Sequence, residues 1–168
     1  MKPVTINDLI SIYDLQSHPE GGFFKETYRD ARLISQQSLP KEFSGDRHIS
    51  TAIYFLIPKD KKSHLHRIKS DEVWHFYLGG PMTLTQISPE GNLEKITLGQ
   101  DIKSGQKLQH VVPSGYWFGA YSNPESDFSF VGCTVAPGFD FADFEMGDRD
   151  QLLKLFPQAR EEIFFLTN

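Results

Sequence analysis

Two histidines separated by one residue, His64 and His66, are the residues of this sequence best suited to chemistry. Side chains two positions apart on a regular β-strand point to the same face of a sheet. Glu72 follows after a short polar turn and would bring a carboxylate beside the two imidazoles. Imidazoles and carboxylates bind divalent metals, and they also act as general acids and bases. The trio therefore predicts either a metal site or a proton-transfer site.

Aromatic side chains follow Glu72 at alternate positions. Trp74 and Phe76 have the spacing of the same strand face, so we expect an aromatic wall beside the carboxylate. After a later proline–glycine turn, Tyr116 and Phe118 alternate in the same way. A tyrosine hydroxyl there can donate a hydrogen bond or a proton to a ligand. Plain core packing is an equally good interpretation for each of these aromatic residues.

The composition limits the classes of protein to which the chain can belong. Its 168 residues fit one domain with a sizeable core. A formal net charge of −5 argues against nucleic acid or an anionic membrane surface as a partner. We also expect no membrane span, because no apolar run is long enough. Cys133 is the one cysteine, so no internal disulfide is possible and a cytoplasmic location is expected.

The elements that would position these residues are mostly short strands. Segments rich in β-branched and aromatic residues alternate with glycine and proline turns, as is typical of a sandwich or barrel. A helix is expected over 5–15, with Thr5 as its candidate N-cap. A second helix is expected directly after Asp148, which is its candidate N-cap, and a last helix is expected over 159–164. The expected strands are 23–29, 50–57, 64–68, 73–78, 82–87, 93–98, 108–112, 116–121, 128–135 and 140–145. The sequence therefore predicts an all-β fold with short terminal helices.

The first long strand has two different faces. Phe24, Glu26 and Tyr28 would share one face, while Arg29 would lie on the other. The pattern does not decide which face meets a cavity. Arg29 is a candidate for binding an anionic group, and solvated charge is the alternative interpretation.

Several motifs, in order, resemble the functionally uncharacterised cupin family known as DUF985 or Cupin_5. The resemblance runs from about residue 18 to residue 167, and its motifs are His18-Pro19-Glu20-Gly21-Gly22, His66-Arg67, Asp71-Glu72-Val73-Trp74-His75, Val112-Pro113-Ser114-Gly115-Tyr116-Trp117 and Ala136-Pro137-Gly138-Phe139-Asp140. It implies a double-stranded β-helix, or jelly-roll barrel, that binds a small organic ligand and is usually a homodimer. We expect one cupin domain over 1–168, with an N-terminal helix in 1–17, the barrel in 18–145 and C-terminal helices in 146–168.

The chain departs from the usual cupin metal-binding pattern. His64, His66 and Glu72 match its first motif, although one extra residue precedes Glu72. Phe118 stands where the second motif would place a further histidine. The resemblance therefore leaves a divalent transition metal open as a cofactor, and no other cofactor is expected.

Three functions follow as alternatives. The first is a metal-free enzyme of the epimerase or isomerase kind, as in the distantly similar dTDP-sugar epimerases. His66 would be its general base, Tyr116 its general acid, and Glu72 would orient His66 or the substrate. The second is a metal-dependent enzyme with His64, His66 and Glu72 as ligands. The third is a module that binds or senses a small molecule without turnover. The expected ligand is a sugar, a nucleotide or a carboxylated compound, and the expected pocket lining is His64, Trp74, Phe76 and Phe118.

Overall fold

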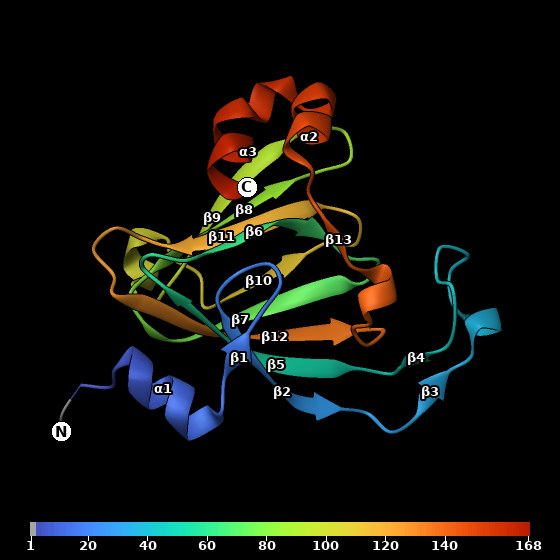
Figure 1. Cartoon of the computed structure of the whole chain (residues 1–168), viewed down its shortest axis with the longest axis horizontal. Helices are drawn as coiled ribbons and strands as arrows, with labels where there is room; N and C mark the ends of the chain where they lie inside the picture. Colours follow the sequence, from blue (N-terminus) through green and yellow to red (C-terminus); the bar gives the residue numbers. More distant parts are fainter. Residues whose placement is uncertain (1–2) are drawn as a thin grey trace.

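Two antiparallel β-sheets face each other in the computed structural model, which describes residues 3–168 (Figure 1). One sheet has six strands in the order β1-β2-β5-β12-β7-β10, and the other has five in the order β13-β6-β11-β8-β9. The first comprises β1 (Gln16–Ser17), β2 (Phe23–Arg29), β5 (Thr51–Pro58), β7 (Asp71–Gly79), β10 (Gln109–Val112) and β12 (Phe128–Ala136). The second comprises β6 (Lys62–Arg67), β8 (Met82–Ile87), β9 (Leu93–Leu98), β11 (Trp117–Ser122) and β13 (Glu145–Met146).

The all-β prediction is confirmed, with two corrections. The sheets form a sandwich and do not close into a barrel. The strand expected over 140–145 is wrong, because the Asp140 carboxylate accepts a hydrogen bond from the amide of Ala142 and starts a 3-10 turn, Phe141–Asp143. Only the two-residue strand β13 follows this turn. The arm formed by β3 (Leu33–Ile34) and β4 (Arg47–His48) extends away from the sandwich (Figure 1).

The terminal helices cover parts of the two outer faces. Helix α1 (Ile6–Tyr13) begins at the predicted cap Thr5 and packs Leu9 on the outer face of the six-stranded sheet. Helices α2 (Arg149–Leu155) and α3 (Arg160–Leu166) cover the outer face of the five-stranded sheet, in red at the top of Figure 1. Within residues 3–168, no helix has the length and apolarity needed to cross a membrane.

The main core lies between the sheets and fills one end of the sandwich. Large apolar side chains from both sheets meet there, among them Phe76, Met82, Leu84, Leu98, Phe118 and Val131. At the other end, where β7 begins and β12 ends, polar side chains replace part of this apolar filling. The space between the sheets stays open at that end, and it forms the candidate site.

Candidate functional site

A cavity of about 350 Å³ lies at the open end of the sandwich. Its aromatic lining comprises Phe24, Phe55, Phe139 and Phe141, and its ionisable lining comprises His18, Glu20, Glu26, Arg29, His48, His66, Glu72, Cys133 and Asp140. This volume suits a small organic molecule, and the mixture of apolar walls with a few polar groups is typical of ligand sites.

A β-bulge in strand β6 decides which of its side chains reach the cavity. Opposite β11, His66 pairs with Phe118, but Ser63 pairs with Ala120, so β6 has one extra residue between these two pairs. The extra residue breaks the alternation of faces, and Ser63 and His66 both reach the Glu20 side chain from β6. The expectation that His64 and His66 share a face is therefore wrong. His64 is not among the lining residues, and its Nδ1 lies 2.8 Å from the carbonyl oxygen of Glu20.

A second bulge changes the faces of strand β2. Opposite β5, Glu26 pairs with Ile53 and Tyr28 pairs with Ala52, which leaves one extra residue on β2. Phe24, Glu26 and Arg29 consequently line the cavity, whereas Tyr28 is exposed. The sequence left open which face of this strand meets the cavity. Phe24 and Glu26 do share a face, as alternation predicts, whereas the bulge separates Tyr28 from them.

A polar contact at the floor of the cavity joins Glu20 to His66. Oε2 of Glu20 lies 3.0 Å from Nε2 of His66, and both side chains are buried. Nδ1 of His66 lies 2.7 Å from the carbonyl oxygen of His64, so it carries a proton and donates it to that oxygen. Burial raises the pKa of Glu20 and lowers the pKa of His66. Both shifts favour a neutral pair in which the Glu20 carboxyl donates to Nε2 of His66.

Two more side chains hold Glu20 in place. The Ser63 hydroxyl donates to Oε1 of Glu20 at 2.8 Å, and Nδ1 of His18 lies 3.4 Å from Oε2. The backbone N–H of Glu20 donates to Nδ1 of His18, which makes this imidazole an acceptor at that atom. Burial lowers the pKa of His18, in agreement with a neutral ring.

A glycine allows the loop before β2 to approach β6 closely enough for these contacts. Gly21 has φ +107°, and a Cβ on it would overlap the carbonyl oxygen of Lys62. The amide of His64 donates to the carbonyl oxygen of Glu20 at 2.7 Å and fixes the loop on the strand. The motif His18-Pro19-Glu20-Gly21-Gly22 therefore delivers two side chains to the cavity.

Glu72 is a second buried carboxyl group in the cavity. It lies on the inner face of β7, where Val135 is its partner on β12. Burial raises its pKa to about 7, while His66 and the Cys133 thiol favour the charged form. In the described part of the chain, the carboxyl within 4.0 Å of the His66 ring nitrogens is that of Glu20, and no such contact joins His66 to Glu72. The orienting contact expected of Glu72 is thus made by Glu20.

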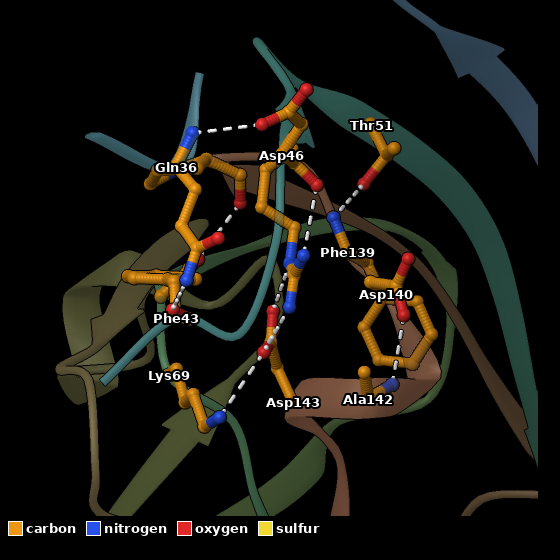
Figure 2. Close-up of polar contacts among 12 residues, drawn as sticks. Gln36, Phe43, Asp46, Thr51, Lys69, Phe139, Asp140, Ala142 and Asp143 are labelled. Carbon is orange, nitrogen blue, oxygen red and sulfur yellow. Dashed lines mark hydrogen bonds and ion pairs between the residues drawn. The ribbon is translucent and has the colours of Figure 1, made fainter. Parts of the chain in front are cut away.

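Part of the cavity wall is formed by a short cap segment, defined here as residues 139–144. The Phe139 amide donates to the Thr51 hydroxyl at 2.9 Å at one end of the segment (Figure 2). At the other end, Asp143 forms an ion pair with Lys69 at 3.4 Å. A buried ion pair strengthens this attachment, because the Arg47 guanidinium binds both oxygens of Asp143, at 2.6 and 2.7 Å. These contacts hold Phe139, Asp140 and Phe141 in the cavity wall.

The other predicted site residues pack near the cavity without lining it. Trp74 and Phe76 share the inner face with Glu72, as expected, but both belong to the main core. Phe118 is also core, and its ring lies 4.1 Å from the His66 ring between centroids. Tyr116 packs against the same core and is not a lining residue. The proposed general acid Tyr116 therefore has no place at the cavity.

The residues present do not fit the metal site that the fold suggests. A transition metal requires several nitrogen, oxygen or sulfur ligands directed at one point. His64 lies outside the cavity lining, and Phe118 supplies an apolar ring beside His66. Across residues 3–168, the structure contains no cluster of three or more His, Cys, Asp or Glu side chains that could hold a metal ion.

Sequence reasoning missed the site residues that depend on loops and bulges. His18 and Glu20 lie in a motif that was recognised as a family feature, but their roles were not assigned. The cavity-facing position of Arg29 follows only from the bulge in β2. The signal available in the sequence was the pair His18 and Glu20 directly before Gly21 and Gly22. Both polar side chains are buried in the structure, although they lie in a glycine-rich loop.

A protein-family model described as Cupin superfamily (DUF985), Cupin_5, matches residues 7–147. Among curated proteins, the uncharacterized protein YML079W of Saccharomyces cerevisiae is 29% identical over 175 residues, which cover 98% of this chain and 87% of that protein.

Solved structures agree with this relationship. A hypothetical protein from Leishmania major is 32% identical with a TM-score of 0.89, and the match covers 98% of this chain and 99% of that one. Protein SO0799 from Shewanella oneidensis is 36% identical with the same TM-score, and 99% of each chain is covered. Oxalate decarboxylase from Bacillus subtilis has a TM-score of 0.54 at 15% identity, covering 89% of this chain and 36% of that one, so it supports the fold alone.

Proposed function

This chain belongs to the Cupin_5 (DUF985) family of the cupin superfamily, and from this premise we propose that it is a single-domain enzyme that isomerises or epimerises a small organic molecule by metal-free proton transfer. The substrate binds in the cavity between the sheets. Two acid–base centres serve the reaction there: Glu72, and the Glu20–His66 pair.

The observation that carries this proposal is the Glu20–His66 contact beside a second buried carboxyl. The pair holds a transferable proton between Oε2 and Nε2 at 3.0 Å. Glu72 has a pKa of about 7, so both of its protonation states are populated near neutral pH. An acid and a base of this kind in one apolar cavity are the requirement for proton abstraction and return.

The proposed reaction uses these groups in sequence. The ionised Glu72 carboxylate removes a proton from a carbon next to a carbonyl group, and the electron pair of the C–H bond moves into that carbonyl. The Glu20–His66 pair then returns a proton to the opposite face of the same carbon, as the electron pair leaves the carbonyl oxygen and forms the new C–H bond. Glu72 ends protonated and the pair ends deprotonated, and exchange with water restores both.

Deuterium exchange tests this proposal. The protein is incubated in D₂O with carbonyl compounds of neutral, anionic and cationic types, and incorporation of deuterium beside the carbonyl is followed by NMR. We expect protein-dependent exchange that falls at least 100-fold in Glu72→Gln, because one general base contributes about 10²–10⁴ in rate. Glu90→Gln, in an exposed hairpin turn, should retain full exchange. Compounds that bind in the cavity without exchanging would favour the module that binds without turnover.

The assembly state and the location are part of the same proposal. We propose a homodimer through the half of the six-stranded sheet that α1 leaves open, where Tyr28, Tyr77 and Val111 are exposed. Sedimentation should show a species of twice 19.2 kDa, and a monomer at dilute concentration would contradict it. A cytoplasmic location is favoured by the buried free thiol of Cys133, and imaging of a fluorescent fusion would check it.

A further inference from the structure

The charged groups of the cavity are unevenly balanced. Four carboxyls line it, from Glu20, Glu26, Glu72 and Asp140. Glu20 is neutral in its pair with His66, and Glu26 is paired with the guanidinium of Arg29, so Glu72 and Asp140 are the carboxyls that the described residues leave unmatched. Burial lowers the pKa of two of the three histidines of the lining, His18 and His66, so these two rings do not offset the carboxyls. A ligand in the cavity therefore meets an excess of negative charge.

Arg29 is already occupied and does not offer an anion site. Its Nε and Nη2 donate to the two oxygens of Glu26, at 3.0 and 2.7 Å. Its Nη1 donates to the carbonyl oxygen of Phe139 at 3.2 Å. An anionic ligand would have to displace a bidentate carboxylate to reach this guanidinium.

Glu72 takes part in none of the ion pairs found among residues 3–168. It is 7% exposed and lines the cavity, and the Cys133 thiol is the hydrogen-bonding neighbour that acts on its pKa. A buried carboxylate of this kind is costly unless a cation or a donor comes to it. The structure therefore leaves a negative charge to be matched by the ligand.

Aromatic rings surround the same space. Phe139 and Phe141 meet edge to face with their centroids 5.0 Å apart, and His18 lies 4.7 Å from Phe24. Together with Phe55, these rings form walls around the carboxyl groups. Aromatic walls attract organic cations through the negative faces of the rings, and the attraction is stronger where water is excluded.

We infer that the cavity selects a small organic cation, a protonated or quaternary amine, with Glu72 as its counter-ion and the phenylalanine rings as its walls. This inference rests on the proposed function, since it takes the cavity to be the substrate site. It replaces the sugar, nucleotide or carboxylated compound that the sequence suggested with a ligand of opposite charge.

Three probes of nearly equal shape test the inference. Choline is the cation, 3,3-dimethylbutan-1-ol is its neutral counterpart, and 3,3-dimethylbutanoate is the anion. Binding to the full chain at pH 8, where Glu72 is mostly ionised, is measured by NMR titration of the cavity phenylalanines. We expect choline to bind at least 10-fold more tightly than 3,3-dimethylbutan-1-ol. We expect 3,3-dimethylbutanoate to bind more weakly than either of them. In Glu72→Gln the preference for choline should fall to about 3-fold or less, and in Glu90→Gln it should stay.

The outcomes separate this inference from the proposed function. Equal or tighter binding of the alcohol or the acid, or no binding of choline, would overturn the inference. An unchanged preference in Glu72→Gln would also overturn it, because another group would then supply the counter-charge. None of these results affects deuterium exchange on a carbonyl compound, which tests proton transfer by itself.

Discussion

The Glu20 carboxyl lies 3.0 Å from Nε2 of His66 and joins the loop before β2 to the inner face of the opposite sheet. Because Nδ1 of His66 donates to the carbonyl oxygen of His64, Nε2 is free to accept the proton of Glu20. The pair is thus held in one arrangement by the backbone, and its proton lies at the cavity wall.

Glutamine at position 20 should imitate the neutral carboxyl. Its amide N–H can donate to His66, and its carbonyl can still accept from Ser63. We expect Glu20→Gln to change the free energy of unfolding at pH 7 by about 1 kcal/mol or less, and Glu20→Ala to cost about 2–3 kcal/mol because buried partners are left unsatisfied. Urea unfolding measures both. Equal destabilisation by the two variants would mean that Glu20 is an ionised carboxylate.

Glu72 should make the folding stability depend on pH near neutrality. The folded protein holds the Glu72 proton up to a pKa of about 7, whereas the unfolded chain releases it near 4.5. The stability from this proton is present below pH 4.5 and is lost as the pH rises through 7. We therefore compare the free energy of unfolding of Glu72→Gln with that of the wild type at each pH. We expect this difference to shift by about 2–3 kcal/mol in favour of the variant between pH 4.5 and pH 8.

The control for this pH dependence is Glu90→Gln, which removes an exposed carboxyl. Its stability relative to wild type should be nearly constant over the same range. If the stability of Glu72→Gln relative to wild type were also constant with pH, the Glu72 carboxyl would have an ordinary pKa.

The strands and helices were largely readable from the sequence because their signals are local. The hairpin Met82–Leu98 has the same strand bounds in the prediction and in the structure, since its turn and its alternating residues lie side by side in the chain. The Thr5 cap was found for the same reason. Asp140 was misassigned to a strand because its own side chain makes the turn that interrupts it.

The candidate site was readable only in part because its geometry comes from pairing between distant strands. Glu72 and His66, which the sequence placed at a pocket, both line the cavity. The roles of Glu20 and Arg29 depend on a loop and on a bulge, and a bulge is set by the partner strand. Alternation along one strand carries no information about such an insertion, so His64 was expected on the wrong face.

His64 and His66 should therefore behave differently when replaced. In the deuterium-exchange assay, we expect His66→Ala to lose at least 100-fold of the rate, because it removes half of the proton-carrying pair. His64→Ala should stay within about 3-fold of wild type and lose about 1 kcal/mol of stability with its hydrogen bond to Glu20. Equal loss of exchange in both variants would contradict the assignment of His64 to a position outside the cavity.

The cap segment should depend on the buried Arg47–Asp143 pair. Both side chains are 4% exposed, so Asp143→Ala leaves a buried guanidinium without its partner and should cost about 3–5 kcal/mol. The matched control is Glu145→Ala, which breaks the exposed Arg67–Glu145 pair and should cost about 1 kcal/mol or less. Urea unfolding of both variants checks this. Similar costs would show that the buried pair does not anchor the segment.

The most direct test of the account is an NMR titration of the Glu72 side-chain carboxyl carbon in the wild-type protein, with the signal assigned by its loss in Glu72→Gln. The account predicts a midpoint of about pH 7, the value that lets a buried carboxyl act as a base in the cavity. A midpoint near 4.5 would contradict it, because Glu72 would then be an ordinary carboxylate beside Glu20 and His66.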